Sequence, residues 1–366
     1  MWGIIIGLVF AASIAAGIYL VFALARFGLI RKLSGEKKWL RLLISAGCIG
    51  AVFGVLKIFF SMINVIIIFL HVTLFFLLFG LGMKIFRKLS GKKPKIYWQG
   101  WLALLTSAVY LSIGYYLCAH VWQTDYDLTT NKQIGTVKAA LIADSHIGAV
   151  FDGDGFAERL EKIQEQSPDI LLIAGDFVDD GTDRENMIKA CDALGKLDLK
   201  YGVWFSYGNH DEGYYGSERR GFSSKDLEEN LERNGVHILK DEYQLIDNRF
   251  YIVGRKDKKD KNRAEIADII DKLDKDKYII VMDHQPGDYD NEAATAADLV
   301  VSGHTHGGQL IPLQPISTLF GFNDMTYGYD RRSDTDFIVT SGIACWEIKF
   351  KTGTKSEFVI INIKQE

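Results

Sequence analysis

Five short apolar segments of this sequence each end in residue types that bind metal ions. They read VKAALIADSH, DILLIAGDFVDD, YGVWFSYGNHD, YIIVMDHQP and ADLVVSGHTHGGQ. Five of the eight histidines lie at these ends, at positions 146, 210, 284, 304 and 306, whereas those at 71, 120 and 237 share no such context. A single Asp-x-His pattern is a weak signal, but five ends of the same form indicate one shared site.

The side chains at these ends offer oxygen and imidazole nitrogen atoms and no thiolate. The candidate ligands are Asp144, His146, Asp176, Asn209, His284, His304 and His306. Such a set suits Mn, Fe, Zn or Co. Seven ligands are too many for one ion that keeps an open position. The set therefore predicts two divalent metal ions that share a bridging carboxylate.

The segments between these ends predict the elements that position the ligands. FAERLEKIQEQ and ENMIKACDALGKL have apolar residues three and four positions apart, which is typical of amphipathic helices. Repeated strand-loop-helix units predict an α/β domain. In such sheets the carboxyl ends of the strands line one crevice, so we expect the five loops to converge there.

In their order along the chain, these loops match a known set of motifs. Asp-x-His, Gly-Asp-x-x-Asp, Gly-Asn-His-Asp, an isolated His and Gly-His-x-His resemble the calcineurin-like metallophosphoesterase superfamily, over about residues 136–365. The extension GHTHGGQ at 303–309 resembles its membrane-associated bacterial branch, which includes lipid-linked UDP-sugar hydrolases and wall-associated phosphoesterases. The resemblance implies two mixed β-sheets sandwiched between helices. The runs at 250–254, 337–341 and 358–363 would supply the second sheet.

The resemblance also implies a role for each site residue. One metal would be held by Asp144, His146 and His306. The other would be held by Asn209, His284 and His304, with Asp176 as the bridge. His210 would be the acid that meets the leaving group. Asp211 would orient the His210 ring, because a carboxylate on one ring nitrogen fixes the tautomer.

Two positions need comment within this resemblance. The branch usually has prolines and an Arg after a Trp in its last block, whereas TSGIACWEIKFKTG places Lys351 about where that Arg would be. A Lys cannot grip phosphate bidentately, so we expect Lys351 to alter substrate binding at that edge. In the doubled Asp179 and Asp180, Asp179 is the motif position, and we interpret Asp180 as a solvated loop charge.

The activity implied is hydrolysis of a phosphate ester or pyrophosphate bond by attack of a metal-bridged hydroxide. The expected substrate is a phosphorylated small molecule or a lipid-linked phosphate. Two alternatives stay open. One is a cytoplasm-facing nucleotide or UDP-sugar pyrophosphatase, and the other is an inactive membrane sensor or scaffold. Every motif position carries a ligand type, which favours an enzyme.

The N-terminal third contains four stretches that are long and apolar enough to span a membrane, which takes about 20 residues each. They cover approximately residues 3–25, 40–60, 63–83 and 98–120. We therefore predict a four-helix transmembrane anchor at 1–125 and a phosphoesterase domain at 126–366, which begins with the polar linker DYDLTTNKQIG.

Basic residues are concentrated in two connections of this anchor. Five Lys or Arg lie between the first two spans, with Arg41 at the start of the second span, and six lie between the last two. The positive-inside rule makes these connections cytoplasmic, so we expect the phosphoesterase domain on the extracytoplasmic face of a cell membrane. The formal net charge of −4 gives no indication of a basic surface, and no nucleic-acid partner is expected.

The four cysteines, at 48, 118, 191 and 345, do not have metal-binding spacing. We interpret them as small buried apolar residues. The sequence leaves open whether Cys191 and Cys345 pair.

Two further patterns surround the candidate site. The run RKDKKDKNR at 255–263 alternates in sign, and we interpret it as a solvated loop. Four aromatic residues surround the GNHD loop, namely Tyr207, Tyr214, Tyr215 and Phe222. They could stack on a base or lie against lipid, and packing is the default interpretation.

Overall fold

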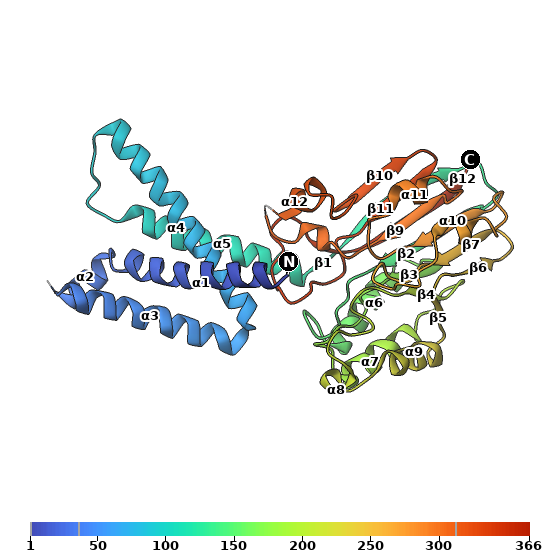
Figure 1. Ribbon diagram of the computed structural model, residues 1–366, viewed down its shortest axis with the longest axis horizontal. Coiled ribbons are helices and arrows are strands. Elements are labelled where there is room, and N and C mark those ends of the chain that lie inside the picture. Colours follow the sequence, from blue (N-terminus) through green and yellow to red (C-terminus); the bar gives the residue numbers. More distant parts are fainter. Residues whose placement is uncertain (1, 36, 312) are drawn as a thin grey trace. The chain divides into compact units, whose positions relative to one another are not determined.

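A computed structural model describes residues 2–35, 37–311 and 313–366. Contacts between Cα atoms divide the chain into two compact units, residues 1–113 and residues 114–366. Figure 1 labels the helices and strands of both units.

The first unit consists of apolar helices. They are α1 (Trp2–Leu24), α2 (Gly28–Ser34), α3 (Lys38–Phe59), α4 (Met62–Ser90) and α5 (Trp98–Ala119), and the last turns of α5 belong to the second unit. Within the described residues, all of these helices except α2 are long and apolar enough to cross a membrane. The four long apolar helices predicted from the sequence are therefore confirmed.

Apolar side chains cover the outside of these helices as well as their contacts. Leu20, Phe27 and Phe76 form part of a small buried cluster between the helices. Phe10 and Leu105, by contrast, are each 63% exposed. Helices that are apolar all round lie either in a large protein core or in a bilayer. The chain is therefore a membrane-associated protein.

Two six-stranded sheets make up the centre of the second unit, as far as its residues are described. The first has the order β1-β12-β2-β3-β4-β5, formed by Val121–Thr130, Ser356–Gln365, Thr136–Ile142, Ile170–Ala174, Val203–Ser206 and Val236–Leu239. The second has the order β10-β11-β9-β8-β7-β6, formed by Gly328–Arg332, Thr335–Val339, Leu299–Ser302, Tyr278–Met282, Phe250–Gly254 and Glu242–Ile246. Each sheet combines parallel neighbours with at least one antiparallel pair, so both are mixed.

The buried strand residues alternate between two cores, because successive side chains point to opposite faces of a sheet. In β3, Leu172 packs in the core between the sheets, whereas Leu171 packs in the core beneath the helices. Helices α6 (Gly153–Gln164), α7 (Arg184–Leu194) and α9 (Ser224–Arg233) cover the first sheet, and α10 (Ile266–Ile270) and α11 (Tyr289–Ala293) cover the second (Figure 1). The predicted sandwich of two mixed sheets between helices is confirmed.

The three helices on the first sheet begin at side-chain caps. Asp152 accepts a hydrogen bond from Gly155 N at the start of α6, and Asp183 accepts one from Asn186 N at the start of α7. Ser223 and Asp226 form a reciprocal capping box at the start of α9. A cap satisfies backbone N–H groups that have no partner within the helix and fixes where the helix begins. The loops that run from β2, β3 and β4 to these helices therefore have fixed ends.

Two expectations about the sheets are wrong. The segment interpreted as a polar linker is mostly the strand β1, which pairs in parallel with β12 along its whole length. The run at 358–363 lies in β12 of the first sheet, between β1 and β2, and not in the second sheet. The runs at 250–254 and 337–341 do contribute β7 and β11 to the second sheet.

Candidate metal centre

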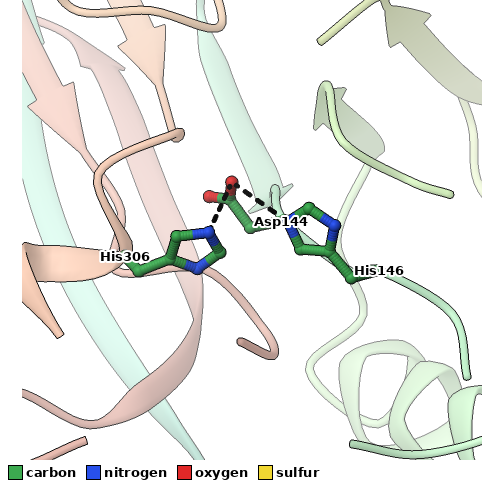
Figure 2. Close-up of side chains that lie close together, drawn as sticks. All are labelled: Asp144, His146 and His306. Carbon is green, nitrogen blue, oxygen red and sulfur yellow. Dashed lines mark ion pairs between the residues drawn. The ribbon is translucent and has the colours of Figure 1, made fainter. Parts of the chain in front are cut away.

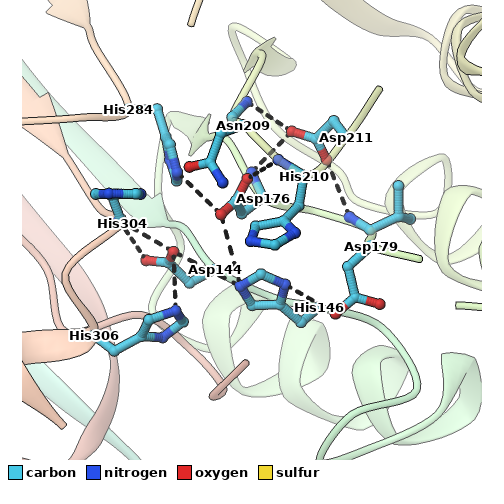
Figure 3. A network of polar contacts seen from close by, with 12 residues as sticks. Asp144, His146, Asp176, Asp179, Asn209, His210, Asp211, His284, His304 and His306 are labelled. Carbon is cyan, nitrogen blue, oxygen red and sulfur yellow. Dashed lines mark hydrogen bonds and ion pairs between the residues drawn. The ribbon is translucent and has the colours of Figure 1, made fainter. Parts of the chain in front are cut away.

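All seven predicted ligands lie in loops at the carboxyl ends of strands from both sheets. Asp144 and His146 follow β2, Asp176 follows β3 and Asn209 follows β4. From the second sheet, His284 follows β8, and His304 and His306 follow β9. Figure 3 shows these side chains turned toward one another. The convergence expected of the five loops is therefore observed.

One group of potential ligands consists of Asp144, His146 and His306, which lie together in Figure 2. Their ligand atoms lie within 4.8 Å of one another. Asp144 Oδ1 lies 4.0 Å from His146 Nε2 and 3.7 Å from His306 Nε2. All three side chains are buried, which favours ligands over solvated surface charges.

A second group consists of Asp176, His284 and His304, whose ligand atoms also lie within 4.8 Å of one another. Asp176 Oδ2 lies 3.1 Å from His284 Nε2 and 3.7 Å from His146 Nε2 of the first group. The Asp176 carboxylate therefore faces both groups. Asn209 lies beside Asp176 and His284 in Figure 3.

Several ligand atoms at this centre are buried without a hydrogen-bond partner among the described residues. They are His146 Nε2, His284 Nε2 and Asn209 Oδ1. A buried polar atom without a partner costs about 1–3 kcal/mol. Lone pairs of nitrogen and amide oxygen beside two carboxylates are the chemistry that a divalent cation satisfies. The residues present therefore fit a pair of bound divalent metal ions.

The backbone at this centre adopts an uncommon conformation. Five of the seven ligands have positive φ angles, namely Asp144 (55°), His146 (38°), Asp176 (53°), His304 (69°) and His306 (49°). Only a few per cent of non-glycine residues have a positive φ angle, and such residues cluster at functional sites. Hydrogen bonds between neighbouring loops stabilise this conformation. Asp144 N donates to Gly175 O (3.0 Å), and His146 N donates to Asp176 O (3.1 Å).

Two glycines allow the loops to approach one another at the centre. A Cβ at Gly208 would lie 2.3 Å from both Asp176 N and Asp176 Oδ1. A Cβ at Gly303 would lie 2.6 Å from Asp144 Oδ2. Neither position has room for a side chain.

Other groups orient the histidine ligands from behind. His284 Nδ1 lies 2.7 Å from Ala174 O, and His146 Nδ1 lies 3.2 Å from Asp179 Oδ2. The hydrogen bond to a carbonyl oxygen places the proton of His284 on Nδ1 and leaves its Nε2 free to bind a metal, and the Asp179 carboxylate favours the same arrangement in His146. Asp179, which the sequence marked only as a motif position, thus orients a predicted ligand.

Burial and neighbouring charges shift the ionisation of these groups. Burial raises the pKa of Asp144 to about 6 and that of Asp211 to about 7, and the charge of Asp176 adds to both shifts. Burial also lowers the pKa of His304 to about 3, which keeps its imidazole neutral, the form that binds metals. Carboxylates gathered in a buried site repel one another, and cations there would relieve the repulsion.

His210 lies at the edge of the ligand groups. Its backbone N–H donates to Asp176 Oδ1 (2.8 Å), and its ring centroid lies 5.2 Å from that of His146. The rings of Tyr214 and Trp346 lie 5.1 and 5.2 Å from it. Trp346 was not predicted as a site residue, because nothing in its local sequence links it to the GNHD loop.

The expected contact between Asp211 and the His210 ring is not formed. The Asp211 carboxylate is completely buried and accepts hydrogen bonds from three backbone N–H groups, those of Asp176 (2.8 Å), Val178 (3.1 Å) and Gly208 (2.7 Å). Asp211 therefore ties the loop after β3 to the loop after β4. Its effect on the centre is through the backbone that carries Asp176 and Asn209.

Lys351 also differs from the expectation. Its side chain is completely buried, and Nζ donates to Ser341 O (2.5 Å) and Gly342 O (3.3 Å). A Cβ at Gly342 would lie 2.7 Å from Asp144 Cβ, so this turn packs directly behind a ligand. The ammonium group is thus engaged by backbone carbonyls and does not lie at a substrate edge.

The run at 255–263 is not simply a solvated loop. Lys259 Nζ donates to Asn209 O (2.5 Å) and lies 4.7 Å from the centroid of the Tyr214 ring. Asp180 likewise is not only a solvated charge, because its carboxylate accepts hydrogen bonds from the backbone of Tyr214 (3.0 Å) and Tyr215 (3.1 Å). These side chains stabilise the loop that carries Asn209 and His210.

The four aromatic residues around the GNHD loop divide into two pairs. Tyr207 and Phe222 are buried in the core beneath the helices, as the packing interpretation predicts. Tyr214 and Tyr215 are 54% and 71% exposed. The exposed pair is therefore available to a substrate or a surface.

Comparison with known proteins supports the assignment made from the loops. The model of the calcineurin-like phosphoesterase family matches residues 137–308. An uncharacterized metallophosphoesterase of Aquifex aeolicus is 32% identical over 193 residues, covering 50% of this chain and 69% of that protein. One from Campylobacter jejuni is 28% identical over 298 residues, covering 77% and 75%.

A protein of Danio rerio named as a transmembrane protein with metallophosphoesterase domain is 25% identical over 283 residues, covering 72% of this chain and 62% of that protein. Its name combines the two features found here, long apolar helices and a phosphoesterase domain. This chain belongs to the calcineurin-like phosphoesterase family of metal-dependent phosphohydrolases.

Proposed function

We propose that the chain hydrolyses a phosphate ester or pyrophosphate bond at the extracytoplasmic surface of a membrane. The observation that carries the proposal is the position of Asp176. Its Oδ2 lies 3.1 Å from His284 Nε2 and 3.7 Å from His146 Nε2, one in each ligand group. A carboxylate shared in this way is what a pair of closely spaced cations requires.

We assign the ligands as the sequence predicts. Asp144, His146 and His306 would hold one cation, and Asn209, His284 and His304 the other, with Asp176 shared. When bound, such cations lower the pKa of water toward about 7 and neutralise negative charge on phosphoryl oxygens. The oxygen and nitrogen donors suit Mn, Fe, Zn or Co.

His210 would supply the proton to the leaving oxygen. Its Nδ1 is buried and has no hydrogen-bond partner within the described chain, so we assign Nε2 to the proton transfer. The hydrogen bond from its backbone to Asp176 keeps the residue next to the shared carboxylate. Tyr214 and Trp346 both contact its ring, which restricts the orientation of the ring.

The surroundings support an anionic substrate. Lys259 Nζ lies over the Tyr214 ring and 3.6 Å from Glu212 Oε2, and we assign its positive charge to attracting the phosphate at the rim of the centre. A phosphorylated small molecule or a lipid-linked phosphate fits such a site in a membrane-associated protein.

The extracytoplasmic location depends on the basic connections of the helical part. Five Lys or Arg in the first connection, with Arg41 just beyond it, and six in the third favour a cytoplasmic position for both. The division into an anchor at 1–125 and a catalytic domain at 126–366 is part of the same proposal. An alkaline phosphatase reporter fused after residue 366 would be active if this end is exported. A fusion protein that is expressed at a normal level but has an inactive reporter would favour the cytoplasm-facing pyrophosphatase.

Hydrolysis by the detergent-purified protein tests the activity, with the released alcohol, phosphomonoester or inorganic phosphate measured according to the substrate. The substrates would include aryl phosphate mono- and diesters, nucleotides and lipid-linked phosphates, each with Mn, Fe, Zn or Mg. Asn209→Ala and His306→Ala should lower kcat/KM at least about 100-fold, as expected when groups that position the reacting atoms are removed. A protein that bound two metal ions and hydrolysed none of these substrates would favour the inactive sensor.

His237→Ala is the matched control for these variants. His237 lies in β5 at the edge of the first sheet and stacks on Trp204 at 4.3 Å, and it belongs to neither ligand group. We expect it to retain activity and metal content. Full activity of Asn209→Ala or His306→Ala would refute the ligand assignment.

A further inference from the structure

Two buried cysteines that are distant in the sequence meet in the second unit. Cys118 is the next-to-last residue of α5, and Cys345 follows β11 in the segment that leads to Trp346. The two Sγ atoms lie 2.8 Å apart across 227 positions of sequence. Each residue is 1% exposed. The other two cysteines have no such neighbour, since Cys48 is exposed and the Cys191 Sγ contacts Met187 Sδ at 3.9 Å.

Hydrogen bonds hold both cysteines in place. Ser356 Oγ donates to Cys118 O (2.7 Å), and one turn earlier Lys351 N donates to Gly114 O (2.9 Å). On the other side, Ile343 N donates to Ala143 O (2.9 Å), two residues before Cys345. The end of α5 and the segment that contains Cys345 are therefore fixed to the same part of the first sheet, and the approach of the sulfurs does not depend on a mobile loop.

We propose that Cys118 and Cys345 form a disulfide bond. A covalent S–S bond is about 2.05 Å long, so its formation requires a sulfur movement of less than an ångström. The pairing that the sequence left open, between Cys191 and Cys345, is replaced by one that it did not consider.

The chemistry needs a disulfide-bearing oxidant, as is present in oxidising compartments. The thiolate of one cysteine attacks the oxidant disulfide, forms a mixed disulfide and releases one oxidant thiolate. The second cysteine thiolate then attacks the protein sulfur of the mixed disulfide and releases the other oxidant thiolate. The protein loses two electrons and two protons, and the oxidant is reduced to two thiols.

The bond would join the end of the last apolar helix to the segment that borders the metal centre. Trp346 follows Cys345 directly and contacts the His210 ring. Gly342, three residues earlier, packs against Asp144. A cross-link at Cys345 would therefore restrain both contacts. It also closes a very long loop, which in the chain-entropy model gives the largest destabilisation of the unfolded chain.

Peptide mapping tests the bond directly. Membranes are treated with iodoacetamide before lysis to trap free thiols, and the full-length protein is digested without reduction. A second sample is reduced, freed of reductant and incubated with oxidised glutathione. We expect a linked pair of peptides containing Cys118 and Cys345 in the glutathione sample, whichever compartment the domain occupies. After oxidation and denaturation, two of the four cysteines should still react with iodoacetamide.

Serine variants provide the controls. In Cys118→Ser we expect all three remaining cysteines to react, whereas Cys191→Ser should keep the cross-link. Oxidised wild type and oxidised Cys191→Ser should melt several degrees above their reduced forms, because the cross-link acts on the unfolded chain, and Cys118→Ser should show no such difference.

Four reactive cysteines after glutathione treatment, or a cross-link that contains Cys191, would overturn the proposal. These measurements require no phosphatase activity, so their outcome is independent of the proposed function.

Discussion

Replacing Gly208 by alanine tests whether close packing of the ligand loops is needed for catalysis. The added Cβ would lie 2.3 Å from Asp176 N and from Asp176 Oδ1, and 2.8 Å from Asp176 Cγ. Ordinary contacts at a Cβ begin at about 3.4 Å, so one of the two loops must move by about 1 Å. The loops cannot separate easily, because Gly208 N and Asp176 N both donate to Asp211 Oδ2.

The expected effects on stability and on catalysis are similar in free energy. Overpacking a buried position typically costs about 1–3 kcal/mol of unfolding free energy. A displacement of about 1 Å at a catalytic centre can cost about 100-fold in rate, which corresponds to about 2.7 kcal/mol of transition-state stabilisation. The displaced group is the carboxylate that faces both ligand groups. We therefore expect kcat/KM to fall about 100-fold in Gly208→Ala, with a folded protein and a lower affinity for metals.

The assay compares kcat/KM, metal content and melting temperature of Gly208→Ala with those of Gly287→Ala. In the control, the new Cβ would meet only Lys258 Nζ closely, at 2.7 Å, and this exposed side chain can move aside. We expect Gly287→Ala to keep its activity within about twofold, the limit of small surface effects. The reasoning is refuted if Gly208→Ala retains wild-type kcat/KM and two bound metal ions.

Three further predictions concern the hydrogen bonds of Lys351, the bound metal ions and the contact of Trp346 with His210. Lys351→Met leaves the buried carbonyl of Ser341 without its Lys351 donor, whereas Gly342 O keeps the hydrogen bond from Glu357 N (3.0 Å). The free energy of unfolding should fall by about 1–3 kcal/mol, measured by thermal melting against Lys364→Met, an exposed lysine of β12. Equal melting temperatures for Lys351→Met and Lys364→Met would contradict a stabilising role of the Lys351 hydrogen bonds. Removal of metals with EDTA should abolish activity and lower the melting temperature, and Mn should restore both, because cations offset the repulsion of buried carboxylates. A melting temperature insensitive to EDTA and Mn would count against bound cations. Trp346→Ala removes a ring 5.2 Å from the His210 ring, and kcat/KM should fall roughly 2- to 10-fold while stability stays nearly unchanged, since Trp346 is 41% exposed.

The sequence predicts the metal centre well because the ligands are tied to strand ends. A buried strand and the loop after it are adjacent in sequence, so a ligand such as Asp144 is recognised together with the element that positions it. Parallel strands then bring separate loops to one edge of a sheet, which requires no knowledge of strand order. The same locality explains why the four long apolar helices could be predicted.

Features that depend on contacts between residues distant in the sequence could not be predicted. Strand β1 alternates exposed polar residues with half-buried ones, so its sequence alone resembles a linker. Only the pairing with β12 identifies it as a strand. Lys351 and Asp211 were given roles at the substrate or on a ring, whereas their partners are backbone groups of other loops. Backbone partners leave no signature in residue types, so no inspection of the sequence alone could identify them.

The backbone conformation at the metal centre explains both the choice of ligand residues and the close packing of the loops. Asp and His are among the few residue types that tolerate positive φ, and they are also metal ligands. The same residues can therefore form the turn and bind the ion. The conformation is stabilised by bonds between neighbouring loops, such as those from Asp144 N to Gly175 O and from His146 N to Asp176 O. Buried carboxylates such as Asp211 add to this support. Hydrogen bonds of the protein backbone therefore support the ligand geometry, which is why we expect a methyl group at Gly208 to be more damaging than its size suggests.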